Sequence, residues 1–158
     1  MKIPWMVVAE SLKGIKEVPG AQHNPEILQM WRDIKRGGIK SDEVPWCAGF
    51  VGACLERVGI ESTRFEGARS YASWGQKLAE PVAGCVVVFS RDGGGHVGFV
   101  VGQDKTGNLL VLGGNQSDEV NVRAFPRSRV TALRWPTGFD VPSVKLATGV
   151  GAMTKGES

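Results

Sequence analysis

Three cysteines and two histidines supply most of the nucleophilic and acid–base chemistry that this sequence offers. Cys47, Cys54 and Cys85 are odd in number and include no C-x-x-C pair, so neither a disulfide framework nor a zinc ribbon is indicated. Cys47 follows Pro45 and opens an apolar stretch with helical spacing, which places it in the first turn of a helix. The unpaired N–H groups and the dipole of a helix start stabilise a thiolate. Cys47 is therefore the candidate nucleophile, with a buried structural thiol as the alternative, and the other two cysteines are expected in the core.

A cysteine nucleophile needs an imidazole to take its proton, and the chain offers only His23 and His96. His96 follows three glycines and opens an apolar stretch with strand character, so its ring can project from a sheet edge toward a helix start. His23 lies in a loop before a predicted helix. The sequence therefore favours His96 as the base.

A third side chain is needed to orient the imidazole, and the segment Gly113–Gln116 ends the strand that follows that of His96. If these two strands form a hairpin about residues 104–107, the end of the second returns to the level of His96. Asn115 is the predicted orienting residue, and Gln116 is the second choice for that role. Trp46 and Gln116 are the residues expected beside the oxyanion or the substrate, with backbone N–H groups of the helix start as an oxyanion hole.

The first part of the chain has helical periodicity. Predicted helices begin at Trp5 and end at Pro19–Gly20, run from the capping residue Asn24 to Gly37, and run from Pro45 to Gly59. A short fourth helix is expected within residues 68–78.

From residue 85 the period changes to that of strands, expected at 85–90, 97–101, 108–112, 119–123 and 130–135. The connections are too short for crossover helices. This order predicts an α+β domain, with N-terminal helices packed on an antiparallel sheet of about five strands. Residues 1–136 are expected to form one domain, and residues 137–158 a loosely ordered tail.

Composition narrows the function classes further. The chain has 158 residues with a formal net charge of +3, and 42% of them are hydrophobic. The charge excess is too small to indicate a nucleic-acid partner, and no apolar run reaches the roughly 20 residues of a membrane span. The start of the chain has no signal-peptide pattern. A zinc site is disfavoured because Cys47 and Cys54 lie two helical turns apart.

Four segments, in this order, resemble the NlpC/P60 and CHAP superfamily of papain-like peptidoglycan hydrolases, and within it the small single-domain type of phages and prophages. They are Asp42–Val51, Val87–Arg91, Gly95–Phe99 and Leu112–Gln116, and the similarity covers roughly residues 4–136. The resemblance implies a papain-like fold and cleavage of an amide bond in the peptide part of peptidoglycan. In that scheme Cys47 attacks the carbonyl, His96 serves as base and then acid, and Asn115 holds the ring.

The resemblance also implies what accompanies the activity. No metal or cofactor is expected, because the acidic calcium loop of some CHAP lysins is not evident, and a monomer is expected. One departure is Cys85, which follows Gly84 where the family typically has aspartate. A lysin without a signal peptide would wait in the host cytoplasm and reach the wall through a holin, and a delivered effector would fit equally. Endopeptidase and N-acetylmuramoyl-L-alanine amidase activities remain open, as do a non-catalytic wall-binding module and a thiol acyltransferase or amidase with another substrate.

Overall fold

The computed structural model describes residues 2–18, 23–42, 44–91, 93–149 and 151, and within them helices come first and strands follow. The α-helices are α1 (Pro4–Ser11), α2 (Pro25–Asp33) and α3 (Cys47–Glu56), and a short 3-10 helix, η1 (Ala68–Ser73), comes next. Six strands follow, with a second 3-10 helix, η2 (Arg127–Arg129), before the last: β1 (Gln76–Lys77), β2 (Val86–Arg91), β3 (Gly94–Gln103), β4 (Leu109–Gly113), β5 (Asn121–Phe125) and β6 (Val130–Trp135). The predicted α+β class is confirmed.

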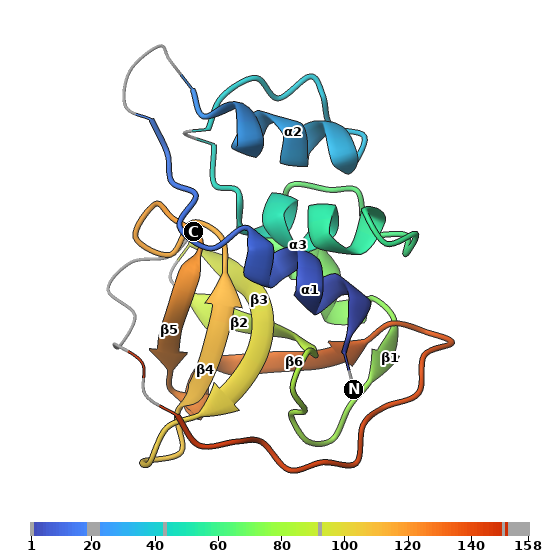
Figure 1. Ribbon diagram of the computed structural model, residues 1–158, viewed down its shortest axis with the longest axis vertical. Coiled ribbons are helices and arrows are strands. Elements are labelled where there is room, and N and C mark those ends of the chain that lie inside the picture. Colours follow the sequence, from blue (N-terminus) through green and yellow to red (C-terminus); the bar gives the residue numbers. More distant parts are fainter. Residues whose placement is uncertain (1, 19–22, 43, 92, 150, 152–158) are drawn as a thin grey trace.

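The strands form one antiparallel sheet in the order β1-β6-β2-β3-β4-β5. Figure 1 shows the helices gathered at one side of this sheet, with α3 next to it and α2 farthest away. The sheet is strongly curled. Two strands separate β2 from β5, yet the ring of Phe125 on β5 stacks on that of Phe89 on β2 with centroids 4.4 Å apart. The curl encloses the side chains that β3 and its neighbours carry on this face.

Helix α3 is the central element of the core. All its residues from Cys47 to Leu55 are buried, whereas the sequence predicted one apolar face. It packs between α2 and α1 on one side and the sheet on the other, and Phe50 meets Phe99 of β3 edge to face at 6.1 Å. Gly59 ends the helical segment with φ +83, the left-handed conformation that favours glycine at this position.

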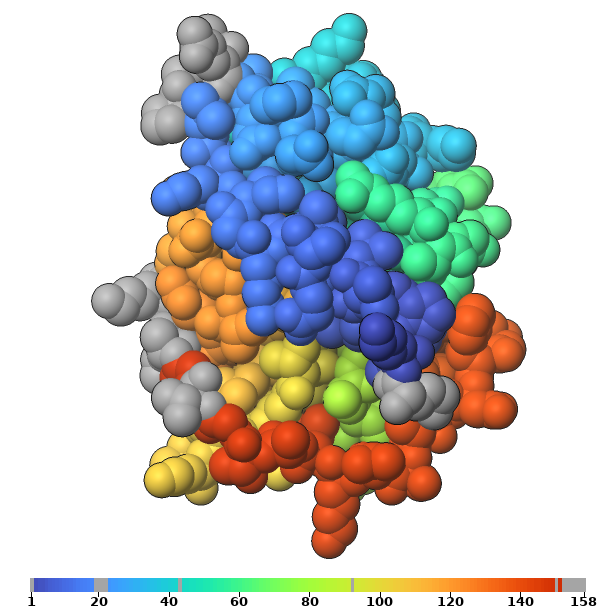
Figure 2. Space-filling model, viewed as in Figure 1, coloured from blue at the N-terminus to red at the C-terminus, as the bar shows by residue number. Residues whose placement is uncertain are grey.

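The first helix is shorter than predicted. It ends at Ser11, and Gly14 turns the chain with φ +94, so that Ile15 and the residues after it run extended instead of continuing to Pro19. This stretch pairs with the connection between β4 and β5: Gly14 N–H donates to Val120 O and Val120 N–H donates to Ile15 O. Figure 2 shows this blue segment lying across the face of the molecule against the orange β4–β5 region. Pairing with a distant loop outweighs the local helical pattern.

The predicted fourth helix is a 3-10 helix followed by a strand. Gly75 separates them with φ +64, and a side chain at Gly75 would collide with the carbonyl of Trp135. That close approach lets Gln76–Lys77 pair with Arg134–Trp135 as β1, a sixth strand that the sequence did not indicate.

Two turns set the register of β3, β4 and β5. Asp104 closes the β3–β4 hairpin, as predicted, because its carboxylate accepts from the N–H groups of Thr106 and Asn108. Ser117 and Asp118 both have positive φ in the tight turn that leads to β5. This pair of left-handed residues matches the right-handed twist of a hairpin.

The described part of the C-terminal stretch contains no regular helix or strand, yet it contacts the sheet. It runs along the lower edge of the molecule in Figures 1 and 2. Gln103 N–H donates to Ala147 O, Gly149 N–H donates to Gln103 O, and the indole of Trp135 donates to Phe139 O. None of the helices in the described ranges is long and apolar enough to cross a membrane.

Candidate active site

Cys47 is the first residue of α3, as the sequence predicted. The first bond of this helix runs from Phe50 N–H to Trp46 O, so the N–H groups of Cys47, Ala48 and Gly49 precede the intrahelical ladder. Cys47 is 2% exposed, and its thiol lies within hydrogen-bond reach of the N–H of Val97, the residue after His96. The nucleophile candidate and the strand of the base candidate therefore meet.

Burial raises the pKa of the Cys47 thiol to about 11. The N–H groups of Val97 and Ala48 and the positive charge of Arg91 act in the opposite direction, and burial outweighs them. At neutral pH the resting group is a protonated thiol. Its ionisation therefore requires a base that takes the proton as the sulfur reacts.

His96 lies on β3 and is fully buried. Its ring is nearly parallel to that of Phe125, with centroids 5.3 Å apart, and it stacks less closely on Phe89 at 6.4 Å. Gly95 and Gly94 precede it, and Gly113 lies beside its Nε2, where a side chain would collide with the amide of Gln116. These contacts leave the imidazole little freedom to rotate.

Gln116 holds the second nitrogen of this ring. Its Oε1 lies 3.0 Å from His96 Nε2. The amide nitrogen of Gln116 donates to Asn121 O at 2.9 Å, to Asn121 Oδ1 at 3.0 Å and to Val111 O at 3.2 Å. Because all three neighbours are acceptors, the NH₂ group must face them and Oε1 must face the ring. His96 Nε2 therefore carries the proton, and Nδ1 is the basic nitrogen of the neutral imidazole.

This geometry corrects the prediction for Asn115. The sequence assigned ring orientation to Asn115, whereas the structure gives Nε2 of the ring to its neighbour Gln116. Asn115 is 4% exposed and has φ +57, a left-handed turn directly after Gly113 and Gly114. This turn places the side chain of the next residue, Gln116, against the ring of His96. The choice between Asn115 and Gln116 therefore depends on the conformation of the folded backbone.

Trp46 was expected beside the oxyanion or the substrate, but its side chain is fully buried. The indole Nε1 donates to Glu17 Oε1 at 2.8 Å. A side chain at Gly114 would collide with the Trp46 ring and with Phe50. Trp46 therefore fixes the start of α3, and Glu17, which sequence reasoning missed, is the residue that ties it to the N-terminal segment.

His23 is engaged elsewhere. Its Nδ1 lies 2.9 Å from Oδ1 of Asp42, a fully buried carboxylate that also accepts from the N–H groups of Val18 and Asn24 at 2.8 Å each. Burial alone would raise the pKa of Asp42, but the hydrogen bonds from Asn24, Val18 and His23 outweigh it and hold that pKa below its usual value. This cluster organises the entry to α2, whereas His96 directly precedes Val97, whose N–H reaches the Cys47 thiol.

Cys54 and Cys85 lie in the core, as expected, and burial raises the pKa of both thiols, that of Cys85 to about 12. Cys85 stands where the family typically has aspartate. The turn before it is held by Gly84, with φ +90, whose carbonyl accepts from the indole of Trp5 at 2.8 Å. A buried thiol is therefore compatible with this turn.

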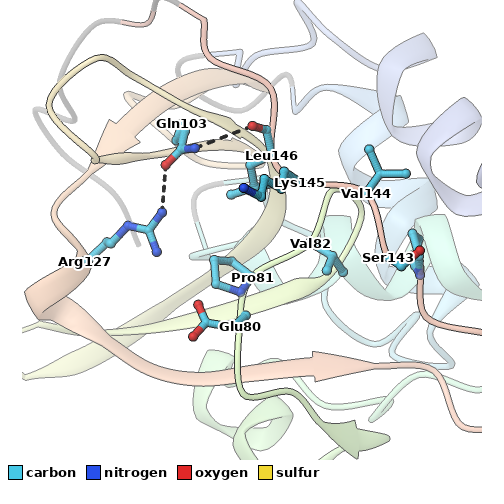
Figure 3. A pocket seen from close by; sticks show the side chains of 10 residues that line it. Glu80, Pro81, Val82, Gln103, Arg127, Ser143, Val144, Lys145 and Leu146 are labelled. Carbon is cyan, nitrogen blue, oxygen red and sulfur yellow. Dashed lines mark hydrogen bonds between the residues drawn. The ribbon is translucent and has the colours of Figure 1, made fainter.

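The cavity in Figure 3 lies away from these residues. It has a volume of about 420 Å³ and lies between the C-terminal stretch, at Ser143–Leu146, and the residues Gln103 of β3 and Arg127 of η2. None of Cys47, His96 and Gln116 lines it. No group of three histidine, cysteine or acidic side chains suited to a metal ion occurs in the part of the chain that the structure describes.

Comparison with known families identifies a domain in this part of the chain. The model of the CHAP domain matches residues 39–115, a range that holds Cys47, the whole of α3 and His96. No curated protein matches the chain. CHAP domains are generally cysteine-dependent peptidoglycan hydrolases or amidases, and the family implies peptidoglycan as the substrate. The match over residues 39–115, together with a cysteine at a helix start and a histidine on the strand that this helix packs against, supports the NlpC/P60 and CHAP superfamily for this chain.

Proposed function

We propose that this protein cleaves an amide bond in the peptide part of peptidoglycan, with Cys47 as nucleophile, His96 as general base and acid, and Gln116 as the residue that orients His96. The observation that carries the proposal is the fixed amide of Gln116. It assigns the proton of the neutral ring to Nε2 and makes Nδ1 the proton acceptor, on a strand whose next N–H reaches the Cys47 sulfur.

The reaction follows from these positions. As the Cys47 sulfur attacks the amide carbon, its proton passes to His96 Nδ1, and the carbonyl electrons move onto oxygen. The N–H groups at the start of α3 stabilise this oxyanion. Collapse expels the amine, which takes the proton from His96, and leaves a thioester on Cys47. Water then attacks the thioester with His96 as base and releases the carboxylic acid and the thiol.

The raised pKa of Cys47 gives the order of events. A thiol with pKa of about 11 is protonated at neutral pH, so proton transfer accompanies attack and does not precede substrate binding. The buried surroundings that raise this pKa also keep bulk water from the reacting atoms.

The proposed biological setting is that of a small phage-type lysin, which the four ordered sequence segments support. Such an enzyme is made in the host cytoplasm and reaches the wall through a holin.

Mass spectrometry of the fragments released from purified Gram-negative and Gram-positive peptidoglycan tests the proposal. Free stem peptides identify an amidase, and cleavage within or between stems identifies an endopeptidase. Cys47→Ala should abolish release, and Cys54→Ala, a matched change in the same helix, should retain it. No release by the wild-type protein from any wall would overturn the hydrolase proposal. It would favour a wall-binding module, or an acyl transferase if an acyl group is transferred to an added amine.

A further inference from the structure

Two arginines hold the backbone turn that leads into His96. Arg69, from η1, donates through Nη2 to Gly94 O at 3.0 Å. Arg91, at the end of β2, donates through Nε to Gly95 O at 3.4 Å. Two guanidinium groups therefore lie at consecutive carbonyls immediately before the residue proposed as the base.

A pocket of about 450 Å³ opens at this turn. Its lining includes Gly94 and Gly95 of β3 and, from the segment around η1, Phe65, Arg69 and Ser70. The glycines keep it open, since a side chain at Gly95 would lie 3.2 Å from Cγ of Arg69. Phe65 is 44% exposed although it is a large apolar side chain, so the pocket combines an apolar surface with the polar groups of Arg69 and Ser70.

The pocket is linked to Cys47 through strand β3. His96 directly follows Gly95, and the thiol of Cys47 is within hydrogen-bond reach of the next N–H, that of Val97. The charge of Arg91 is close enough to act on Cys47. Gly95 and Val97 are two residues apart on β3, which is about 7 Å along an extended strand. The pocket is therefore within the reach of a peptide whose scissile carbonyl lies at Cys47.

The charge of the pocket is positive. Each of the two hydrogen bonds uses one of the five N–H donors of its guanidinium group. Among the residues that the structure describes, no carboxylate forms an ion pair with Arg69 or Arg91. A planar guanidinium group with open donors binds a carboxylate more favourably than a neutral amide, because the hydrogen bonds are charge-assisted and can be bidentate.

We propose that this pocket is a specificity subsite that binds a free carboxylate of the stem peptide beside the scissile bond, with Arg69 as its principal ligand, Arg91 as a second positive charge, and Phe65 against the aliphatic part of the same residue. The inference rests on the proposed function and goes beyond it, because it predicts that stems with a free carboxylate at this position are cleaved in preference to stems in which it is amidated.

Pairs of synthetic stem peptides test this subsite. The two peptides of a pair differ at one carboxylate, which is a free acid in one and a carboxamide in the other. For one of these pairs, the wild-type protein should cleave the free-acid peptide with a kcat/KM about ten- to a hundredfold above that of the carboxamide peptide, mainly through a lower KM. Arg69→Gln should bring this ratio close to one. Arg69→Lys should restore part of the preference. Arg127→Gln, which removes the same charge near the β3–β4 hairpin, should leave the ratio as in the wild type.

A binding measurement keeps this test separate from that of the proposed function. Calorimetric titration of Cys47→Ala with the same peptide pairs measures the preference without turnover. Equal affinity for every acid and amide pair, or an unchanged ratio in Arg69→Gln, would overturn the subsite. An acid preference in binding, with no cleavage by the wild-type protein, would support the subsite and contradict the hydrolase.

Discussion

At the scale of single residues, the protonation of His96 depends on the amide of Gln116. The amide nitrogen of Gln116 is surrounded by three acceptors, so only one orientation of the amide satisfies its hydrogen bonds. In that orientation Oε1 accepts from the His96 ring. Asn121 is part of this arrangement, since it also donates from Nδ2 to Gln116 O at 2.8 Å. The side chain that orients the ring is thus itself held by two strands of the sheet.

Replacing Gln116 by alanine should lower kcat by about ten- to a hundredfold, because His96 loses the partner that fixes its tautomer. KM should change little. Steady-state kinetics on a soluble stem peptide measures both constants. Asn115→Gly is the matched control, since glycine accepts the left-handed backbone and only the side chain is lost. A larger loss in Asn115→Gly than in Gln116→Ala would return the orienting role to Asn115.

The raised pKa of Cys47 predicts the pH dependence of its alkylation. Below a pKa of about 11 the thiol is mostly protonated, so the rate of reaction with iodoacetamide should rise about tenfold per pH unit from pH 7 to about 10. Peptide-resolved mass spectrometry of the folded protein follows Cys47 separately from Cys54 and Cys85. Limited access of iodoacetamide to the thiol would lower the alkylation rate at every pH without moving the midpoint of the pH–rate curve. A midpoint near neutral pH would instead show a resting thiolate–imidazolium pair.

The sequence places Cys47 at a helix start and His96 on a strand correctly, because helix position and strand order are local properties. It does not separate Asn115 from Gln116, because that choice depends on a positive φ after two glycines. Glu17 escapes sequence reasoning for a different reason: its bond to Trp46 joins residues 29 apart in the chain, and no local pattern indicates it.

At the scale of elements, the start of α3 is fixed from two directions. The Trp46 indole is bonded to Glu17 in the N-terminal segment, and its ring packs on Gly114 at the end of β4. The same turn continues to Gln116, so one short segment contacts the residue before Cys47 and also carries the partner of His96. The approach of α3 to this turn therefore sets the geometry of the whole site.

Gly114→Ala tests this close approach. The added carbon would lie 2.6 Å from Cβ of Phe50 and 2.8 Å from the Trp46 ring, so α3 or the turn must shift. We expect a loss of about 1–3 kcal/mol in the free energy of unfolding and a fall in kcat. Chemical denaturation and kinetics measure the two effects. Gly38→Ala, where an added carbon meets nothing within 4 Å, should change neither, and a Gly114→Ala protein with wild-type stability and kcat would contradict this account.

Element types are predictable here to the extent that they rest on local pattern. Asn24 caps α2 as expected, its side chain accepting from Glu26 N–H at 2.8 Å, and the Asp104 hairpin forms where the turn residues indicate. The first helix and β1 are the exceptions. Both are decided by pairing with distant backbone, Ile15 with Val120 and Gln76 with Trp135.

At the scale of the whole molecule, the curled sheet and the N-terminal segment lie close to the candidate site, whereas the C-terminal residues that the structure describes do not line it. The curl brings Phe125 of β5 against His96 and Phe89, which completes the wall around the imidazole. The N-terminal segment lies against the β4–β5 turn near the site. The described part of the C-terminal stretch instead runs along the lower side of the molecule in Figure 1, and it includes none of the residues proposed for catalysis.

Removal of residues 137–158 should therefore affect stability more than catalysis. The shortened protein loses both backbone hydrogen bonds of Gln103 to the tail and the bond from the Trp135 indole to Phe139 O. We expect the free energy of unfolding to fall by about 1–3 kcal/mol and kcat of the folded protein to stay within about twofold. Urea denaturation and peptide cleavage provide the two values. A folded, shortened protein without activity would show that the tail takes part in the site.

The most direct test of the central claim is to identify the acyl-enzyme. Wild-type protein mixed with a stem peptide and quenched in acid should carry a thioester on the peptide that contains Cys47, detected by mass spectrometry and removed by hydroxylamine. Cys47→Ala should show neither adduct nor turnover, whereas Cys54→Ala should show both. Turnover that persists in Cys47→Ala, or an adduct on a residue other than Cys47, would contradict the proposed mechanism.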